Sequence, residues 1–203
     1  SAAAVKRAAY LSFLVAGIAG LILAAMTTWW LVVIGAISIF AAWAYTGGKR
    51  PYGYSGYGEI SVFIFFGIVA TMGSYYVQTQ TLTWEGFIVA VPIGTLSCAI
   101  LAINNIRDRA KDVIVGKHTL AVRLGDRGSR NFFFALLLTA HATVLLTLTP
   151  WALLTLGLLP LTLRLGRLVR NGADGLALIP LLAKTGQLQL LFAALLAIAL
   201  WLS

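Results

Sequence analysis

The chain has 203 residues, of which 60% are hydrophobic and only 10% are charged. Its mean hydropathy is +0.92, and a soluble domain usually carries about 25% charged residues, so the composition indicates an integral membrane protein. The 15 Lys and Arg residues outnumber the six Asp and Glu residues. Too few polar residues remain to form a soluble nucleic-acid-binding surface, so the positive charge is better explained by membrane topology and an anionic substrate, and no nucleic-acid partner is expected.

Apolar stretches predict the spanning segments, because a helix needs about 20 mostly apolar residues to cross the hydrocarbon core. The expected spans are 9–27, 29–45, 60–80, 86–105, 131–149, 151–169 and 185–202. Longer connections are expected at 46–59, 81–85, 106–130 and 170–184. Only helices and closed barrels satisfy their backbone in lipid. We therefore expect an all-α bundle of about seven transmembrane helices that forms a single domain over residues 1–203.

The placement of charge supports this number of helices. If the spans alternate in direction, all 15 basic residues fall on one side of the membrane, and the only charged residue in the connections on the opposite side is Glu85. The positive-inside rule then predicts a multi-pass protein of the cell (inner) membrane whose basic connections face the cytoplasm. Most acidic residues lie on the same side: Asp108, Asp112, Asp126 and Asp174. Any site built from them is expected to face the cytoplasm.

The segment Asn104–Asp112 carries the pattern most suggestive of chemistry. Side chains four residues apart stack on one helical face, so Asn104, Asp108 and Asp112 are expected to point to one spot. Oxygen ligands suit Mg²⁺, which usually takes one or two carboxylates together with substrate phosphates. The segment therefore predicts a metal site that binds a diphosphate.

Neighbouring residues favour this site over an ordinary solvated loop. Two carboxylates four residues apart are common by chance, and a cytoplasmic loop accounts for them equally well. Asn104 and Asn105, however, are adjacent amides at the end of a membrane helix, where polar groups usually mark function. Arg107 and Lys111 stack beside the carboxylates and suit phosphate groups.

The connection 46–59 contains five glycines and three tyrosines and does not favour a stable helix. It is either a flexible loop with interfacial tyrosines or an ordered cover over a site. As a cover, its glycines let the backbone approach a ligand, its tyrosine rings contact an aromatic or isoprenoid group, and Lys49 and Arg50 reach phosphate. Tyr45 would lie above the same site if the preceding helix continues to Lys49.

At these two places the sequence resembles the UbiA superfamily of intramembrane prenyltransferases. Tyr45-x-x-x-Lys49-Arg50 is similar to the Y-x-x-x-K signature of that superfamily, and Asn104–Asp112 is similar to its second aspartate-rich motif. Within the superfamily, the branch that prenylates 1,4-dihydroxy-2-naphthoate in menaquinone synthesis is the most similar. The segments that carry this second resemblance are Tyr45–Gly48, Gly56–Glu59, Asn104–Asp108 and Gly116–Gly125.

The resemblance implies nine helices around a cavity, with Mg²⁺ held between two aspartate-rich motifs. The metal binds a polyprenyl diphosphate, whose prenyl group alkylates the naphthoate with loss of its carboxylate and gives demethylmenaquinone. Asp108, Asp112 and Lys49 would be catalytic, and Asp108, Asp112 and Asn104 would hold the metal. The implied substrate-binding residues are Tyr45, Arg50, Tyr52, Tyr57, Asn104, Asn105, Arg107, Lys111 and Lys117.

The chain departs from the superfamily in one respect: it contains no first aspartate-rich motif. With about seven helices of nine, it is expected to lack the N-terminal two helices and half of the metal site. Two alternatives stay open. One is a sister enzyme with another aromatic acceptor, such as 4-hydroxybenzoate or homogentisate, although the tyrosine–glycine connection favours naphthoate. The other is a non-catalytic, transporter-like protein, which the gathering of charge at one face disfavours.

Overall fold

The computed structural model describes residues 1–203, except for the side chain of Ala2, and across this part of the chain it contains helices and no strand. The helices are α1 (Ala2–Met26), α2 (Trp30–Thr46), α3 (Gly58–Val62), α4 (Ala70–Thr79), α5 (Trp84–Ile114), α6 (Leu120–Val144), α7 (Leu159–Arg170) and α8 (Leu178–Trp201). A π-helical segment, η2 (Phe63–Val69), joins α3 to α4, and a 3₁₀ segment, η4 (Pro150–Leu158), leads into α7.

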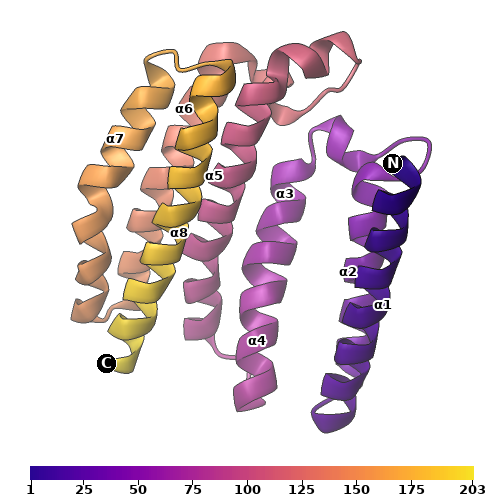
Figure 1. The fold of residues 1–203 in the computed structure, drawn as a ribbon. Helices are drawn as coiled ribbons and strands as arrows, with labels where there is room; N and C mark the ends of the chain where they lie inside the picture. The colour runs from indigo at the N-terminus through magenta and orange to yellow at the C-terminus, as the bar shows by residue number, and fades with distance from the viewer.

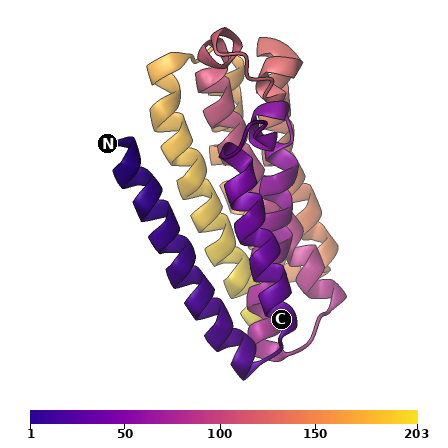
Figure 2. The ribbon, with the colours of Figure 1, turned by 90° about the vertical axis from the view of Figure 1, so that its right-hand side faces the viewer.

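These elements form seven helical segments, here called rods, which cross the bundle in alternating directions (Figures 1 and 2). Six are long and apolar enough to cross a membrane, and α2 is apolar and 17 residues long. The predicted all-α membrane bundle is therefore confirmed. The connections 47–57, 115–119 and 171–177 lie together at one end, which carries all 15 basic residues and is called the basic end below.

Two of the expected connections are wrong in length. The predicted connection 106–130 is largely helical: α5 continues to Ile114, and α6 begins at Leu120 with a short helical stretch that a kink at Gly125, where φ is +69°, separates from the rest of α6. The predicted connection 170–184 is also shorter, since α8 begins at Leu178. Hydropathy marks where a helix leaves the hydrocarbon layer, whereas backbone hydrogen bonding continues into water wherever residues such as Arg, Lys and Ala favour the helix.

The buried core lies among α5, α6, α7 and α8. Its largest fully buried side chains include Ile103 of α5, Phe133 and Leu137 of α6, and Phe192 of α8. The α1–α2 hairpin lies to one side of this bundle (Figure 1). Most of its large apolar side chains are exposed, as Phe40 is, and in a membrane such side chains meet lipid.

One backbone contact fixes the distance between η2 and α5. A Cβ atom added at Gly67 would lie 2.5 Å from the Cα atom of Gly94, so the two helices touch where neither has a side chain. We expect Gly67→Ala to force the helices apart and to lower the free energy of unfolding by about 1–3 kcal/mol. Thermal unfolding in detergent measures this loss. Gly73→Ala is the control, because a Cβ atom there meets no atom within 4 Å; equal melting of both variants would contradict the contact.

Candidate active site

The end of α5 presents the predicted carboxylates at the basic end. Asn104, Asp108 and Asp112 all lie within the regular helix, four residues apart. The Arg107 guanidinium donates two hydrogen bonds to the Asp108 carboxylate, from Nε to Oδ1 at 2.9 Å and from Nη2 to Oδ2 at 2.6 Å. Asp112 is only 6% exposed, and its Oδ1 lies 3.4 Å from the Lys117 Nζ atom. Each carboxylate therefore has a cationic partner.

The oxygen ligands on this face of α5 suit a metal ion whose other ligands come from a substrate and from water. Among the residues that the structure describes, no group of three or more His, Cys, Asp or Glu side chains is placed to hold a metal ion. Asp108 and Asp112 nevertheless supply two carboxylates, which is the usual protein contribution to a Mg²⁺ that also binds phosphates and waters. The residues fit a shared magnesium–diphosphate site and do not form a closed protein site.

The connection 47–57, the Tyr–Gly loop, is docked on the segment that follows α5. The His118 backbone N–H donates to the Tyr54 carbonyl at 2.8 Å, and Arg123 Nη2 donates to the Ser55 carbonyl at 2.7 Å. The Lys117 Nζ atom lies 4.3 Å from the centre of the Tyr54 ring, a cation–π contact. At Gly56, where φ is +83°, a Cβ atom would lie 2.8 Å from the Arg123 Nε atom, so only glycine fits this turn. These contacts favour the ordered cover over the flexible loop.

The helix that contains Tyr45 does not continue to Lys49, so the condition for placing Tyr45 above the same site is not met. α2 ends at Thr46, because Gly47 is extended and Gly48 adopts a φ of +78°. The Tyr45 ring instead packs edge-to-face against the Tyr52 ring, with centroids 5.5 Å apart.

The Tyr52 hydroxyl fastens the loop between two helices. It donates to the Ala41 carbonyl at 2.9 Å and lies 2.8 Å from the Ser61 Oγ atom. Four further predicted site residues are exposed: Lys49, predicted as catalytic, and Arg50, Tyr57 and Lys111, predicted to bind substrate. None of these four forms a hydrogen bond or ion pair between side chains within the described part of the chain.

Glu59, which was not among the predicted site residues, lies buried beside α5. Its side chain is 6% exposed, and Asn105 Nδ2 donates to its Oε1 at 3.0 Å. The Oε2 atom is buried and has no hydrogen-bond partner among the described residues. Such an orphaned acceptor is costly unless a ligand completes it. A sequence signal existed, because an ionisable residue that opens an apolar span usually marks function.

Asn104 lies on a different side of α5 from Asn105 and borders an apolar cavity. This cavity has a volume of about 500 Å³ and lies between α3–η2, α5 and α8. Its lining is mainly hydrophobic: Val62, Phe66, Ile100, Leu101 and Leu182, with the polar residues Ser97, Asn104 and Gln189. The face of α5 that carries the carboxylates thus continues into a space suited to a hydrocarbon chain.

The chain is similar to known prenyltransferases. The profile of the UbiA prenyltransferase family matches residues 2–175. A protein of Mycobacterium tuberculosis named 1,4-dihydroxy-2-naphthoate octaprenyltransferase is 46% identical over 93% of this chain and 65% of its own length. A protein of Escherichia coli with the same name is 38% identical over 85% of this chain and 58% of its own length.

The name of a third relative specifies a phytyl group as the group transferred. A Synechocystis protein named 2-carboxy-1,4-naphthoquinone phytyltransferase is 31% identical over 80% of this chain and 55% of its own length. The chain thus spans 65% or less of the length of these three relatives. No solved structure matches the chain. The extent of the profile match and the identity to these relatives confirm the resemblance seen in the motifs: the chain belongs to the UbiA prenyltransferase family.

Proposed function

We propose that the complete protein transfers a polyprenyl group from a polyprenyl diphosphate to 1,4-dihydroxy-2-naphthoate, with loss of the carboxylate, to give demethylmenaquinone in its reduced 1,4-dihydroxy (quinol) form. The observation that carries this proposal is the carboxylate face of α5 at the basic end, covered by the Tyr–Gly loop and bordered by an apolar cavity. The names of the relatives support the choice of acceptor.

The diphosphate would bind at the end of α5. Asp108, Asp112 and the Asn104 amide oxygen would hold Mg²⁺, which when bound supplies positive charge to the departing diphosphate. Lys117 and Arg107 are the cations paired with these carboxylates, and the exposed Lys49 and Arg50 would reach the phosphates from the loop. The bond between the prenyl carbon and the diphosphate oxygen breaks there, and its electron pair leaves with the diphosphate, which these charges stabilise.

The acceptor would lie beside the prenyl carbon that is bonded to the diphosphate. The prenyl carbon forms a bond with the ring carbon that carries the carboxylate, and carbon dioxide then leaves and returns its electron pair to the ring. The cavity beside Asn104 would hold the prenyl chain, and the orphaned Oε2 of Glu59 would accept a hydrogen bond from a hydroxyl of the acceptor. The basic end would face the cytoplasm of the cell membrane.

Turnover with a choice of acceptors tests this function. Membranes that contain the complete protein are given labelled polyprenyl diphosphate together with 1,4-dihydroxy-2-naphthoate, 4-hydroxybenzoate or homogentisate. We expect a prenylated product from the naphthoate alone, and we expect chelation of Mg²⁺ to abolish it. Turnover of 4-hydroxybenzoate alone would instead assign the chain to a sister enzyme.

Lys49→Ala separates donor binding from acceptor binding. Because Lys49 is exposed on the Tyr–Gly loop, its loss should raise the KM for the polyprenyl diphosphate about tenfold, the usual cost of one charged hydrogen bond. The KM for the acceptor should stay unchanged. Lys184→Ala, an exposed lysine at the same end, is the control. An equal rise in both KM values would show that Lys49 shapes the site as a whole.

A further inference from the structure

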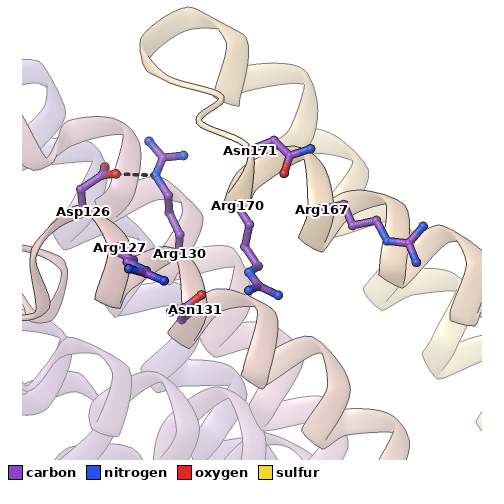
Figure 3. Close-up of a pocket in the computed structure, with 7 residues that line it drawn as sticks. All are labelled: Asp126, Arg127, Arg130, Asn131, Arg167, Arg170 and Asn171. Atoms are coloured by element: carbon purple, nitrogen blue, oxygen red, sulfur yellow. Dashed lines mark hydrogen bonds and ion pairs between the residues drawn. The ribbon is translucent and has the colours of Figure 1, made fainter.

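A second cavity, which is lined by polar residues, lies at the basic end between α6 and α7 (Figure 3). Its volume is about 600 Å³, and it shares no residue with the carboxylate face of α5. The lining residues are Asp126, Arg127, Arg130 and Asn131 of α6, Arg167 and Arg170 of α7, and Asn171 just after α7. Four guanidinium groups and one carboxylate leave a formal excess of three positive charges in this pocket.

The one carboxylate of the pocket is already neutralised. Asp126 accepts from Arg130 Nε at 2.9 Å and from Arg109 Nη2 at 3.0 Å. Arg130 also donates from Nη1 to the carbonyls of Val169 and Ala173, at 2.6 and 2.7 Å, so it ties α6 to the end of α7. Asp126 therefore cannot offset the remaining arginines of the pocket.

Three arginines of the pocket have no anionic partner. Within the described part of the chain, no carboxylate lies within 4.0 Å of Arg127, Arg167 or Arg170. The Arg170 guanidinium leans over the Phe134 ring of α6, 5.3 Å from its centre. In Figure 3 the side chains of Arg127 and Arg170 come from the two helices that border the pocket. Guanidinium groups that line one pocket without a carboxylate partner favour a bound anion, and their geometry matches that of phosphate.

The position of the pocket decides which anion it suits. It lies where two helices long and apolar enough to span a membrane reach the basic end, near the start of α6 and the end of α7, and lipid headgroups are expected at this height. Leu168, next to Arg167, is 41% exposed, and Leu138 is 37% exposed on α6 below the pocket, so apolar surface continues toward the membrane. A phosphate above hydrocarbon is the chemistry of a phospholipid, and basic pockets between spanning helices recognise such headgroups. We propose that the α6–α7 pocket binds the phosphate of an anionic phospholipid.

Lipid binding to the purified chain tests the proposal without any substrate of the enzyme. Native mass spectrometry compares phosphatidylglycerol with phosphatidylcholine of the same acyl chains. We expect phosphatidylglycerol to bind more tightly, and we expect Arg127→Gln/Arg170→Gln to weaken it about 30-fold, at about fivefold for each charge removed. The control is Arg164→Gln/Lys184→Gln, which removes two exposed charges from the same end but outside the pocket and should change binding less than twofold.

Three outcomes would overturn the proposal. Equal binding of the two lipids would show that the pocket does not recognise anionic lipid. Equal weakening in the pocket and control variants would show a diffuse effect of net charge. Displacement of phosphatidylglycerol by millimolar inorganic phosphate or pyrophosphate would assign the pocket to a soluble anion. If the loss of the Phe134 contact lowers the yield of folded protein, Arg127→Gln/Arg167→Gln removes the same charge and keeps that contact.

Discussion

Asp108→Asn and Asp112→Asn should each lower kcat/KM of the complete protein by on the order of 10²–10³-fold, as the loss of one charge-stabilising group does at other active sites. Each substitution keeps the shape of the side chain and removes the negative charge that now meets Arg107 or Lys117. The fold should persist, because the amide has nearly the volume of the carboxylate that it replaces and so fits even at Asp112, which is 6% exposed. Initial rates with labelled polyprenyl diphosphate over a range of Mg²⁺ concentrations measure the effect.

The control for both variants is Asp174→Asn. Asp174 is a carboxylate at the same end of the bundle. Among the described residues its side chain accepts one hydrogen bond, from the Gly175 backbone N–H. Its replacement should leave the rate within about twofold, as surface substitutions usually do. Near-normal rates in both Asp108→Asn and Asp112→Asn would remove these residues from the metal site, and the proposed mechanism would lose its centre.

Glu59→Gln should reduce kcat/KM for the acceptor about 10- to 100-fold, the usual cost of losing a hydrogen bond to a charged group. Glutamine can keep the bond from Asn105 to Oε1, but it places an N–H₂ group where the orphaned Oε2 now lies. An N–H₂ group at that position cannot accept a hydrogen bond from the hydroxyl of the naphthoate. The KM for the polyprenyl diphosphate should stay unchanged, because the phosphates would bind at the end of α5.

The second glutamate of the chain provides the comparison. Glu85 is exposed at the opposite end of the bundle, so Glu85→Gln should leave both KM values and kcat unchanged. If Glu59→Gln alters the melting temperature but neither acceptor parameter, Glu59 is a packing residue, and the acceptor is oriented by another group.

The sequence predicts the membrane architecture well because hydropathy and charge placement can be read from consecutive residues, without knowledge of contacts between distant segments. Apolar runs near bilayer length and basic residues on alternate connections suffice for the number of helices and the basic end. The same reasoning places Asn104, Asp108 and Asp112 on one helix. It misjudges helix ends, because Arg107 to Lys111 look like loop residues by polarity yet continue α5.

Contacts between distant segments are what sequence reasoning misses. Arg127 and Arg170 share a pocket only because α6 and α7 pack side by side, and no local pattern relates them. The link between Lys117 and Tyr54 likewise depends on how the Tyr–Gly loop folds back over the end of α5. Glu59 could have been suspected from its place at a span boundary, but its partner Asn105 is 46 residues away.

The π-helical segment η2 sets the rotation of the rod that contains Glu59. Glu59 and Tyr75 are 16 residues apart, and in an unbroken α-helix, at about 100° for each residue, they would point about 160° apart. Yet both face α5, since Glu59 meets Asn105 and Tyr75 lies near Gly86. The wider turn of η2 holds one extra residue and turns the lower half back by about 100°. The extra residue in the wider turn of η2 thus lets α3 and α4 contact α5 with the same side of one continuous helical segment.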